Sequence, residues 1–234
     1  MSSYIPKTVI LMIAISFFSL AASAQLGYNY SPYDIGVAGG INKVYGDAQT
    51  QKNTKSLHLS FTYNQTPFIN YVFEAQIGNL AGGNAVKDLY GRQFSNDYSA
   101  YIARAQLQAG ELIDYDNNAV ANAFKNFYLS TGLGLVVNNN TTNRYSYQIN
   151  LYTPGENQST EVFLPIRIGY EFKIFNAYNE PSVKIDLAYQ YNYVFGDELD
   201  GFKAGNSNDT FTQVTLGVKF ALGVKTSYRK QISD

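Results

Sequence analysis

The sequence predicts an all-β protein, an eight-stranded antiparallel up-and-down transmembrane β-barrel. The first observation is that apolar and polar residues alternate over eight segments, as they do when successive side chains of a strand point to opposite faces. The second is that the clearest of these segments is long enough to cross a bilayer. The third is that aromatic residues gather at one level of the predicted barrel.

Residues 1–24 predict a signal peptide that precedes the barrel. Lys7 supplies a positive charge, an apolar run covers 9–22, and Ala22-Ser23-Ala24 forms a small-x-small cleavage site. The apolar run is shorter than the stretch that a transmembrane helix needs to span the bilayer. We therefore expect export of the chain, cleavage of the signal peptide and a barrel domain over 25–234.

The composition of the 234 residues narrows the class of protein. The 17 Lys and Arg nearly balance the 18 Asp and Glu, which argues against a partner that is a nucleic acid. There is no Cys, so disulfides and thiolate metal sites are excluded. Aromatic residues reach 15% and charged residues only 15%, a balance that argues against a disordered chain.

Three segments alternate most clearly, and all 19 positions on their apolar faces are aliphatic or aromatic. Five earlier segments repeat the pattern less purely. Eight strands result, and an even number suits an up-and-down barrel. In chain order the apolar faces are Ile35, Val37, Gly39 and Ile41; Leu57, Leu59, Phe61 and Tyr63; Tyr71, Phe73, Ala75 and Ile77; Tyr101, Ala103, Ala105 and Leu107; Phe127, Leu129, Leu133, Leu135 and Val137; Val162 to Ile174 on even positions; Val183 to Phe195 on odd positions; and Val214, Leu216, Val218, Phe220 and Leu222.

A soluble eight-stranded barrel also alternates, with its apolar face inside. Strand length favours the membrane, because Val183–Phe195 spans roughly 31 Å along the axis at a tilt of about 40°. The connections favour it as well, since long external loops and short periplasmic turns alternate in membrane barrels. The expected long links are 46–55, 81–98, 138–160 and 196–210, the short ones are 66–69 and 176–181, and 110–125 is a medium link in which Asn118–Phe124 suits a helical turn.

Aromatic residues on the apolar faces fall near the periplasmic ends of six strands. Rings of this kind are favoured where a membrane meets water. We predict an aromatic girdle formed by Phe61, Tyr63, Tyr71, Phe73, Phe127, Tyr170, Phe172 and Phe220.

The polar faces carry charged residues that we assign to the barrel interior. An isolated charge in a narrow barrel would be strongly destabilised, so each needs a partner. We predict an interior charge network of Glu74, Arg104, Arg167, Glu171, Lys184, Asp186 and Lys219. Because eight strands leave room only for side chains, we expect the interior to be plugged.

With these features the chain resembles the small eight-stranded outer-membrane barrels, the OmpA/OmpX-like group, in the form found in Bacteroidota. The resemblance is one of pattern, and its sharpest match is the assembly signal Thr215, Gly217, Phe220 and Leu222, by which the barrel assembly machinery recognises a last strand. It implies a cell outer-membrane location in contact with outer-membrane lipid and lipopolysaccharide. Residues 223–234 follow the signal and are expected to form a short periplasmic tail.

A weaker resemblance is to accessory barrels of the type IX secretion system. It is based on Gly40, the triplet Tyr45-Gly46-Asp47 and the turn Thr66-Pro67-Phe68. This resemblance implies an envelope protein as partner and remains an alternative.

The sole histidine, His58, offers one route to catalysis. Some outer-membrane lipid A deacylases are eight-stranded barrels that use a His-x-Ser pair with a carboxylate, and His58, Ser60 and Glu74 would be the corresponding set. Those enzymes expose the pair to lipid, whereas we assign His58 and Ser60 to the inner face. We therefore interpret His58 as a polar interior residue and keep a lipid A-modifying enzyme as a further alternative.

The link 196–210 holds Asp197, Glu198, Asp200 and Asp209, whose oxygens would suit Ca²⁺ but lack an EF-hand spacing. We expect a solvated loop, and we predict no metal, no cofactor and no catalytic residue. The leading functional prediction is a non-enzymatic integral outer-membrane barrel, either structural or displaying its long loops as a binding scaffold.

Overall fold

The computed structural model describes residues 27–88, 90–115, 118–146, 150–178, 180–204 and 208–229. The predicted signal peptide lies outside these residues. The long strands are β2 (Tyr33–Tyr45), β3 (Asn53–Asn64), β4 (Ile69–Gly83), β5 (Gln93–Gln108), β6 (Phe127–Asn143), β9 (Gln158–Phe175), β10 (Pro181–Val194) and β11 (Thr210–Leu222). The short elements are β1 (Gly27–Tyr30), α2 (Ala109–Leu112), α3 (Ala119–Phe124), β7 (Tyr145–Ser146), β8 (Leu151–Tyr152) and β12 (Thr226–Arg229).

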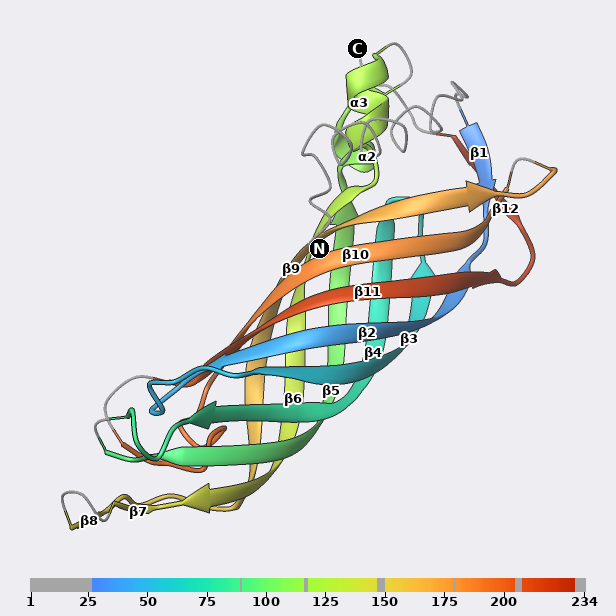
Figure 1. Cartoon of the computed structure of the whole chain (residues 1–234). Helices are drawn as coiled ribbons and strands as arrows, with labels where there is room; N and C mark the ends of the chain where they lie inside the picture. The colour runs from blue at the N-terminus through green and yellow to red at the C-terminus, as the bar shows by residue number, and fades with distance from the viewer. Residues whose placement is uncertain are drawn as a thin grey trace, which may run out of the picture.

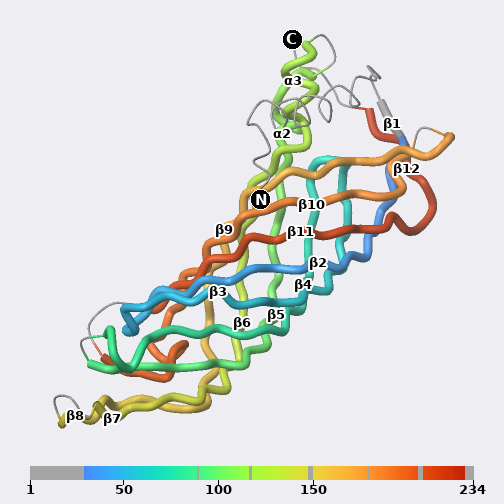
Figure 2. The backbone as a smooth tube through the Cα atoms, in the orientation of Figure 1, coloured from blue at the N-terminus to red at the C-terminus, as the bar shows by residue number. Residues whose placement is uncertain are grey.

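The eight long strands form one closed barrel in the order β10-β11-β2-β3-β4-β5-β6-β9 (Figures 1 and 2). Every neighbouring pair is antiparallel. Closure is made by β2 and β11, whose ladder runs from Tyr33 opposite Leu222 to Tyr45 opposite Thr210. The predicted eight-stranded up-and-down barrel is confirmed, as is the predicted pairing of its first and last strands.

The short elements lie at opposite ends of the barrel (Figure 1). We call one end of the barrel the turn end; it holds the β3–β4 turn, the β9–β10 turn, α2, α3 and the β1–β12 pair. The loop end has the β7–β8 hairpin and the connections β2–β3, β4–β5 and β10–β11. The predicted helical turn is confirmed by α3, where the Asn118 side chain accepts hydrogen bonds from the N–H groups of Val120 and Ala121. Within the expected tail, residues 226–229 form β12, which pairs with β1.

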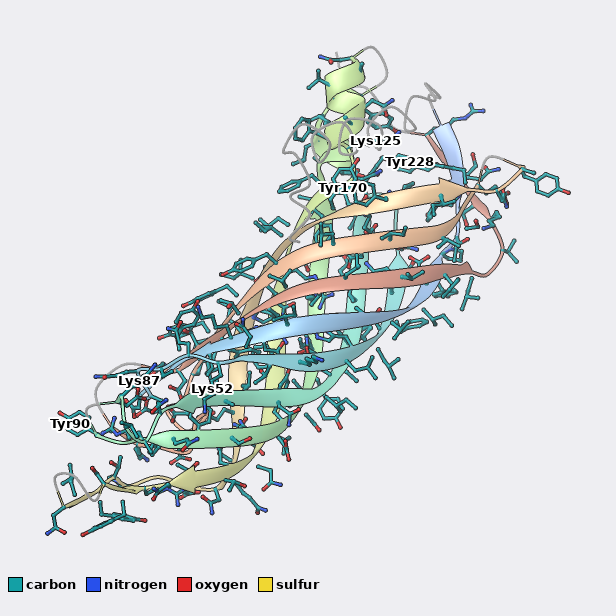
Figure 3. The ribbon with its side chains drawn as sticks, viewed as in Figure 1. Lys52, Lys87, Tyr90, Lys125, Tyr170 and Tyr228 are labelled. Carbon is teal, nitrogen blue, oxygen red and sulfur yellow. The ribbon has the colours of Figure 1, made fainter. Side chains whose placement is uncertain are left out.

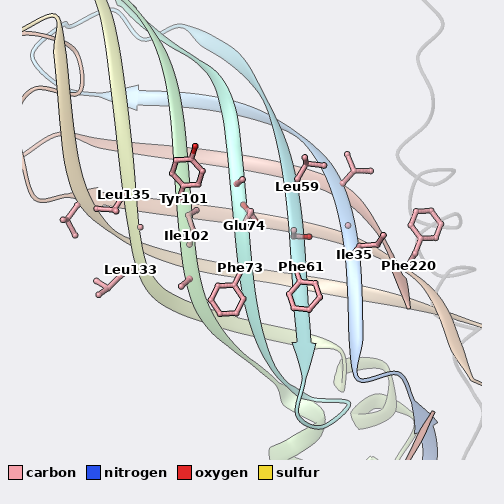
Figure 4. Close-up of a pocket in the computed structure, with 17 residues that line it drawn as sticks. Ile35, Leu59, Phe61, Phe73, Glu74, Tyr101, Ile102, Leu133, Leu135 and Phe220 are labelled. Carbon is pink, nitrogen blue, oxygen red and sulfur yellow. The ribbon is translucent and has the colours of Figure 1, made fainter. Parts of the chain in front are cut away.

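The barrel wall carries an apolar outer belt. Residues that face outward on adjacent strands form rows across the sheet, and two such rows enclose a furrow of about 1070 Å³. Its floor is the backbone of the inward-facing residues between the rows. Figure 4 shows Leu135, Tyr101 and Leu59 in one row and Leu133, Phe73 and Phe61 in the other. These side chains are 44–62% exposed, a degree of apolar exposure that suits contact with lipid rather than with water.

In the loop-end half of the barrel the polarity of β5 reverses, which was not predicted. On β5 the outward residues Gln93, Ser95 and Asp97 are polar, while Phe94 and Tyr98 point inward and are buried. The buried apolar cluster of this half, the loop-end core, is Val44, Ala48, Leu80, Phe94, Tyr98, Ala100, Ile102, Val136, Phe163, Val194, Leu199, Phe202 and Phe211. The expectation of an apolar exterior is therefore wrong for the loop end of β5, whereas the outward Tyr189, Tyr191 and Tyr193 continue the apolar face of β10.

The reason lies in the strand lengths. The ladder of β4 and β5 continues to Gly83 opposite Gln93, so half of the predicted long link 81–98 is strand. Likewise β6 and β9 are 17 and 18 residues long and absorb much of the predicted link 138–160. Strands of this length extend past the apolar belt. There the outward residues of β5 are polar, and the interior holds the loop-end core together with buried polar side chains such as Asn96, Gln190 and Gln213.

The position of the belt gives a test on a single strand. Leu133 and Thr141 both face outward and are exposed on β6, the former in the middle of its apolar run and the latter beyond it. We expect Leu133→Arg to lower the free energy of unfolding in lipid vesicles by about 2–4 kcal/mol, because the charge enters the bilayer centre. The matched Thr141→Arg change should stay within about 0.5 kcal/mol. Equal effects in urea unfolding would contradict the assigned belt.

Candidate functional site

The interior of the turn-end half is filled by ion pairs. Glu74 on β4 lies at the centre of one group, where its Oε2 accepts a hydrogen bond from Arg104 Nη2 at 2.7 Å. Arg167 Nη1 approaches the same oxygen at 3.9 Å. The three side chains are only 1–3% exposed, so each charge depends on the others for the stabilisation that water supplies elsewhere.

Asp186 on β10 forms a second group with cations from two other strands. Arg167 Nη2 lies 3.0 Å from Asp186 Oδ2, and Lys219 Nζ lies 3.4 Å from the same oxygen. The Tyr128 hydroxyl donates to Asp186 Oδ1 at 2.8 Å and accepts from Arg167 Nε at 3.0 Å. Arg167 therefore joins the Glu74 and Asp186 groups.

The remaining charges lie nearer the turn end. Lys219 Nζ is 2.6 Å from Glu171 Oε1, and Gln108 donates to Glu171 Oε2 at 2.7 Å. Lys184 Nζ is 2.5 Å from Asp34 Oδ2. These contacts link β2, β5, β9, β10 and β11 through the middle of the barrel.

All seven residues of the predicted interior network point inward and each takes part in an ion pair. Sequence analysis missed Asp34, the partner of Lys184, and Tyr128, which bridges Arg167 and Asp186. Both could have been found from the alternation of side chains between the two faces of a strand. Asp34 directly precedes the outward Ile35, and Tyr128 follows the outward Phe127, so both fall on the inner face.

His58 occupies the geometry of a Ser–His–carboxylate set, but with Ser56 rather than Ser60. His58 Nε2 lies 2.8 Å from Ser56 Oγ, and Nδ1 lies 2.9 Å from Glu74 Oε1. Ser60 is opposite Glu74 in the β3–β4 register, yet it is not the residue that His58 contacts. His58 is 1% exposed, in agreement with its interpretation as an interior residue.

The hydrogen bonds around Ser56 do not suit a nucleophile. The Asn42 amide nitrogen donates to the backbone carbonyl of Asn79, which orients Asn42 Oδ1 toward the Ser56 hydroxyl at 2.9 Å. Ser56 donates its proton to that oxygen, so it presents a lone pair to the His58 ring. A catalytic serine needs the reverse, with its proton directed at the imidazole nitrogen.

Aromatic residues close the turn end. Phe68 from the β3–β4 turn is fully buried, and the rings of Tyr115 and Tyr228 pack against it with centroids at 5.5 and 5.9 Å. Lys173 lies 4.9 Å from the Phe68 ring and Lys125 lies 5.0 Å from the Tyr115 ring (Lys125 and Tyr228 are labelled in Figure 3). The three rings and the two ammonium groups cover the interior network from this side.

The β10–β11 connection closes the loop end. It folds back so that Leu199 and Phe202 are fully buried within the loop-end core. The Phe202 ring packs edge-on against Phe94 with a centroid distance of 6.4 Å. The predicted solvated loop is therefore wrong for this segment, because the apolar loop-end core offers these two side chains a place to be buried.

Two carboxyl groups of the predicted acidic loop are buried as well. Asp200 is 0% and Asp209 1% exposed. Burial raises the pKa of Asp200 to about 7, and burial together with the neighbouring carboxylate of Asp200 raises the pKa of Asp209 to about 9. No group of three or more His, Cys, Asp or Glu side chains suited to a metal ion occurs among the residues that the structure describes.

The predicted girdle residues all face outward. Their rings are half-buried or exposed near the turn end of the belt, and Tyr63 stacks on Tyr71 with centroids 6.3 Å apart. Tyr33 extends this row with its ring 5.8 Å from Tyr63, and it was not included in the prediction.

The predicted assembly signal lies on the last strand of the barrel. On β11, Thr215 and Gly217 face the barrel interior, whereas Phe220 and Leu222 face outward and are 49% and 43% exposed. The role of these residues in assembly stays a prediction.

The chain was compared with known families, curated proteins and solved structures. No protein-family model and no curated protein matches the chain. Among solved structures, Neisserial surface protein A is similar at 14% identity with a TM-score of 0.49, over 83% of this chain and 99% of that one. Ail of Yersinia pestis, in complex with the heparin analogue sucrose octasulfate, is similar at 13% identity with a TM-score of 0.45, over 81% and 97% of the two chains. OprG of Pseudomonas aeruginosa is similar at 12% identity with a TM-score of 0.39, over 82% and 98%.

The interior network gives a stability prediction. Glu74→Gln leaves Arg104 without its buried counter-charge, so we expect the free energy of unfolding in vesicles to fall by about 3–5 kcal/mol. Glu156→Gln removes an exposed carboxylate from the β8–β9 connection and should change it by less than about 0.5 kcal/mol. If urea titrations showed the two variants to be equally stable, the Glu74 group would not hold the barrel together.

Proposed function

We propose that this protein is a non-enzymatic outer-membrane barrel with a closed interior, which displays its loop-end connections outside the cell as a binding scaffold. The observation that supports this most directly is that side chains lie inside the barrel at both ends and between them. The aromatic cluster of Phe68 covers one end, the ion-pair network fills the turn-end half, and Leu199 and Phe202 cover the other end.

The proposed location in the outer membrane is supported by the outer belt. Every backbone N–H and C=O in a bilayer needs a partner within the protein, and a closed barrel meets this need without an exposed edge. Apolar outward residues on all eight strands then contact the lipid. Lipopolysaccharide in the outer leaflet and the barrel assembly machinery during insertion are the partners that this location implies.

The proposed scaffold is the loop end, where strands that extend past the belt hold the connections away from the membrane. The β7–β8 hairpin is the outermost of these connections in Figure 1. It exposes Tyr145 at 37%, Leu151 at 46% and Tyr152 at 61%. Exposed aromatic and apolar side chains on a rigid support are typical of recognition surfaces.

A second candidate is an accessory subunit of an envelope complex, such as the secretion system predicted as an alternative. It is favoured by exposed apolar side chains at the turn end, among them Leu112 at 72%, Val120 at 64% and Phe124 at 56%. Co-purification from gently solubilised membranes, compared between the wild type and a Val120→Ser/Phe124→Ser variant, tests this role. A partner that is lost only in the variant would support it.

A closed interior predicts the absence of a conducting pore. We expect the purified protein in planar bilayers to give no large, stable conductance steps, because side chains from every strand meet inside an eight-stranded barrel. A heat-modifiability gel of the same preparation shows that the barrel is folded, since folded barrels migrate anomalously until boiled. Large and stable steps from folded protein would overturn the proposal.

The proposed orientation can be tested on intact cells. Val86 in the β4–β5 connection is 84% exposed at the loop end, and Tyr178 in the β9–β10 turn is 82% exposed at the turn end. We expect an epitope inserted after Val86 to bind antibody on intact cells. An epitope after Tyr178 should bind only after the outer membrane is permeabilised. The reverse result would invert the barrel, and no binding at either site before permeabilisation would argue against surface display.

A further inference from the structure

The β10–β11 connection is held in the barrel mouth by two buried carboxyl groups. Asp200 Oδ1 accepts from the Phe202 N–H at 3.0 Å, and Asp209 Oδ2 accepts from the Leu199 N–H at 3.0 Å. Both bonds hold the backbone of the residues whose side chains enter the loop-end core. Asp200 Oδ2 also accepts from the Asp47 N–H at 2.9 Å, which ties the connection to the residues after β2.

The two carboxyl groups converge beside Gly46. A Cβ at this position would lie 2.4 Å from Asp209 Oδ1 and 2.7 Å from Asp200 Oδ2, so only glycine leaves room for the pair. None of the ion pairs found among the described residues includes Asp200 or Asp209. Two carboxylates this close and this buried would repel one another if both were ionised.

The charges around the pair increase this repulsion. The other carboxylates that act on it are Asp47, Glu161 and Asp197, and Glu198 in turn lies beside Glu161 and Asp197. The cations are fewer and are directed elsewhere. Arg92 lies 3.8 Å from Asp47, Lys203 is largely exposed beside Glu198, and Arg144 Nε donates to the Gly201 carbonyl. The mouth therefore carries an excess of negative charge whenever its carboxyl groups are ionised.

We propose that residues 195–204 of the β10–β11 connection are a proton-controlled gate, which is seated in the barrel mouth while Asp200 and Asp209 retain protons and is released when both ionise. Release uncovers the apolar inner wall formed by residues such as Phe94 and Phe211. The ion-pair network below remains in place, so the gate controls access to an apolar cup rather than to a channel.

The direction of the pH dependence follows from the raised pKa values of the two groups. In the released connection the two carboxyls have ordinary pKa values of about 4. The seated state is therefore most favoured below that pH, and the preference is lost as the pH rises through about 7 for Asp200 and about 9 for Asp209. Between these two values, the opening equilibrium should rise by about tenfold for each pH unit, since one more proton is lost on opening.

A single thiol can report the gate, because the chain has no cysteine. Leu199→Cys places the thiol in the seated connection, and Val86→Cys places one on an exposed loop as the reference. We expect the labelling rate at residue 199 by a membrane-impermeant methanethiosulfonate, divided by the rate at residue 86, to rise by about tenfold or more from pH 6 to pH 9. A ratio that does not change with pH would overturn the proposal.

The variant Asp200→Asn/Asp209→Asn separates the gate from other titrating groups. Neutral amides cannot ionise, so the ratio should stay within about twofold from pH 6 to pH 9. The matched Asp97→Asn variant changes an exposed carboxylate on the outer wall and should retain the wild-type profile. A pH response that persists in the double variant would show that other groups control the connection.

A single variant and a comparison of EDTA with Ca²⁺ complete the test. If the double variant fails to fold on a heat-modifiability gel, Asp209→Asn alone should reduce the slope above pH 7. Each profile is measured in EDTA and in Ca²⁺, and the pH response should persist in EDTA. Labelling that responds to Ca²⁺ and is flat with pH in EDTA would instead assign the cluster to cation binding and overturn the gate. Conductance is unaffected in either case, so failure here is distinct from failure of the proposed closed barrel.

Discussion

The pairing of every backbone amide within a sheet is the constraint on which the rest of this structure depends. A sheet in lipid has no water to satisfy its edges, so the first and last strands must meet, and β2 and β11 do so along their whole length. Closure with eight strands then sets the internal width. At that width the interior holds side chains and little else, and the chemistry of those side chains decides what the barrel is able to do.

The interior shows two different solutions to the problem of filling this space. Where the outer wall is apolar, the inner wall is ionic, and charges from different strands neutralise one another at distances of 2.5–3.9 Å. Toward the loop end the outer face of β5 becomes polar, and the inner wall holds an apolar core beside buried polar side chains. The change of polarity along β5 marks the end of the apolar belt on this strand, since each face of the strand matches the surroundings on its own side.

The set of Ser56, His58 and Glu74 illustrates why proximity alone does not establish catalysis. The distances match those of a Ser–His–carboxylate relay, but the backbone carbonyl of Asn79 orients Asn42, and Asn42 Oδ1 in turn accepts the hydrogen bond that Ser56 donates. Because Glu74 also pairs with Arg104, its negative charge is shared with the structural network. The same atoms that resemble a catalytic set therefore contribute to holding four strands together.

The sequence by itself determined the number of barrel strands, their faces and seven members of the ionic network, because a strand places alternate residues on opposite sides whatever its neighbours are. Only the tertiary structure decided the partners, such as Asp34 for Lys184 and Ser56 for His58, since these depend on register and on rotamers across the barrel. It also decided that Leu199 and Phe202 are buried and that Asp200 and Asp209 are brought together at Gly46. A loop has no period, so its contacts are set by the shape and polarity of the mouth that it enters.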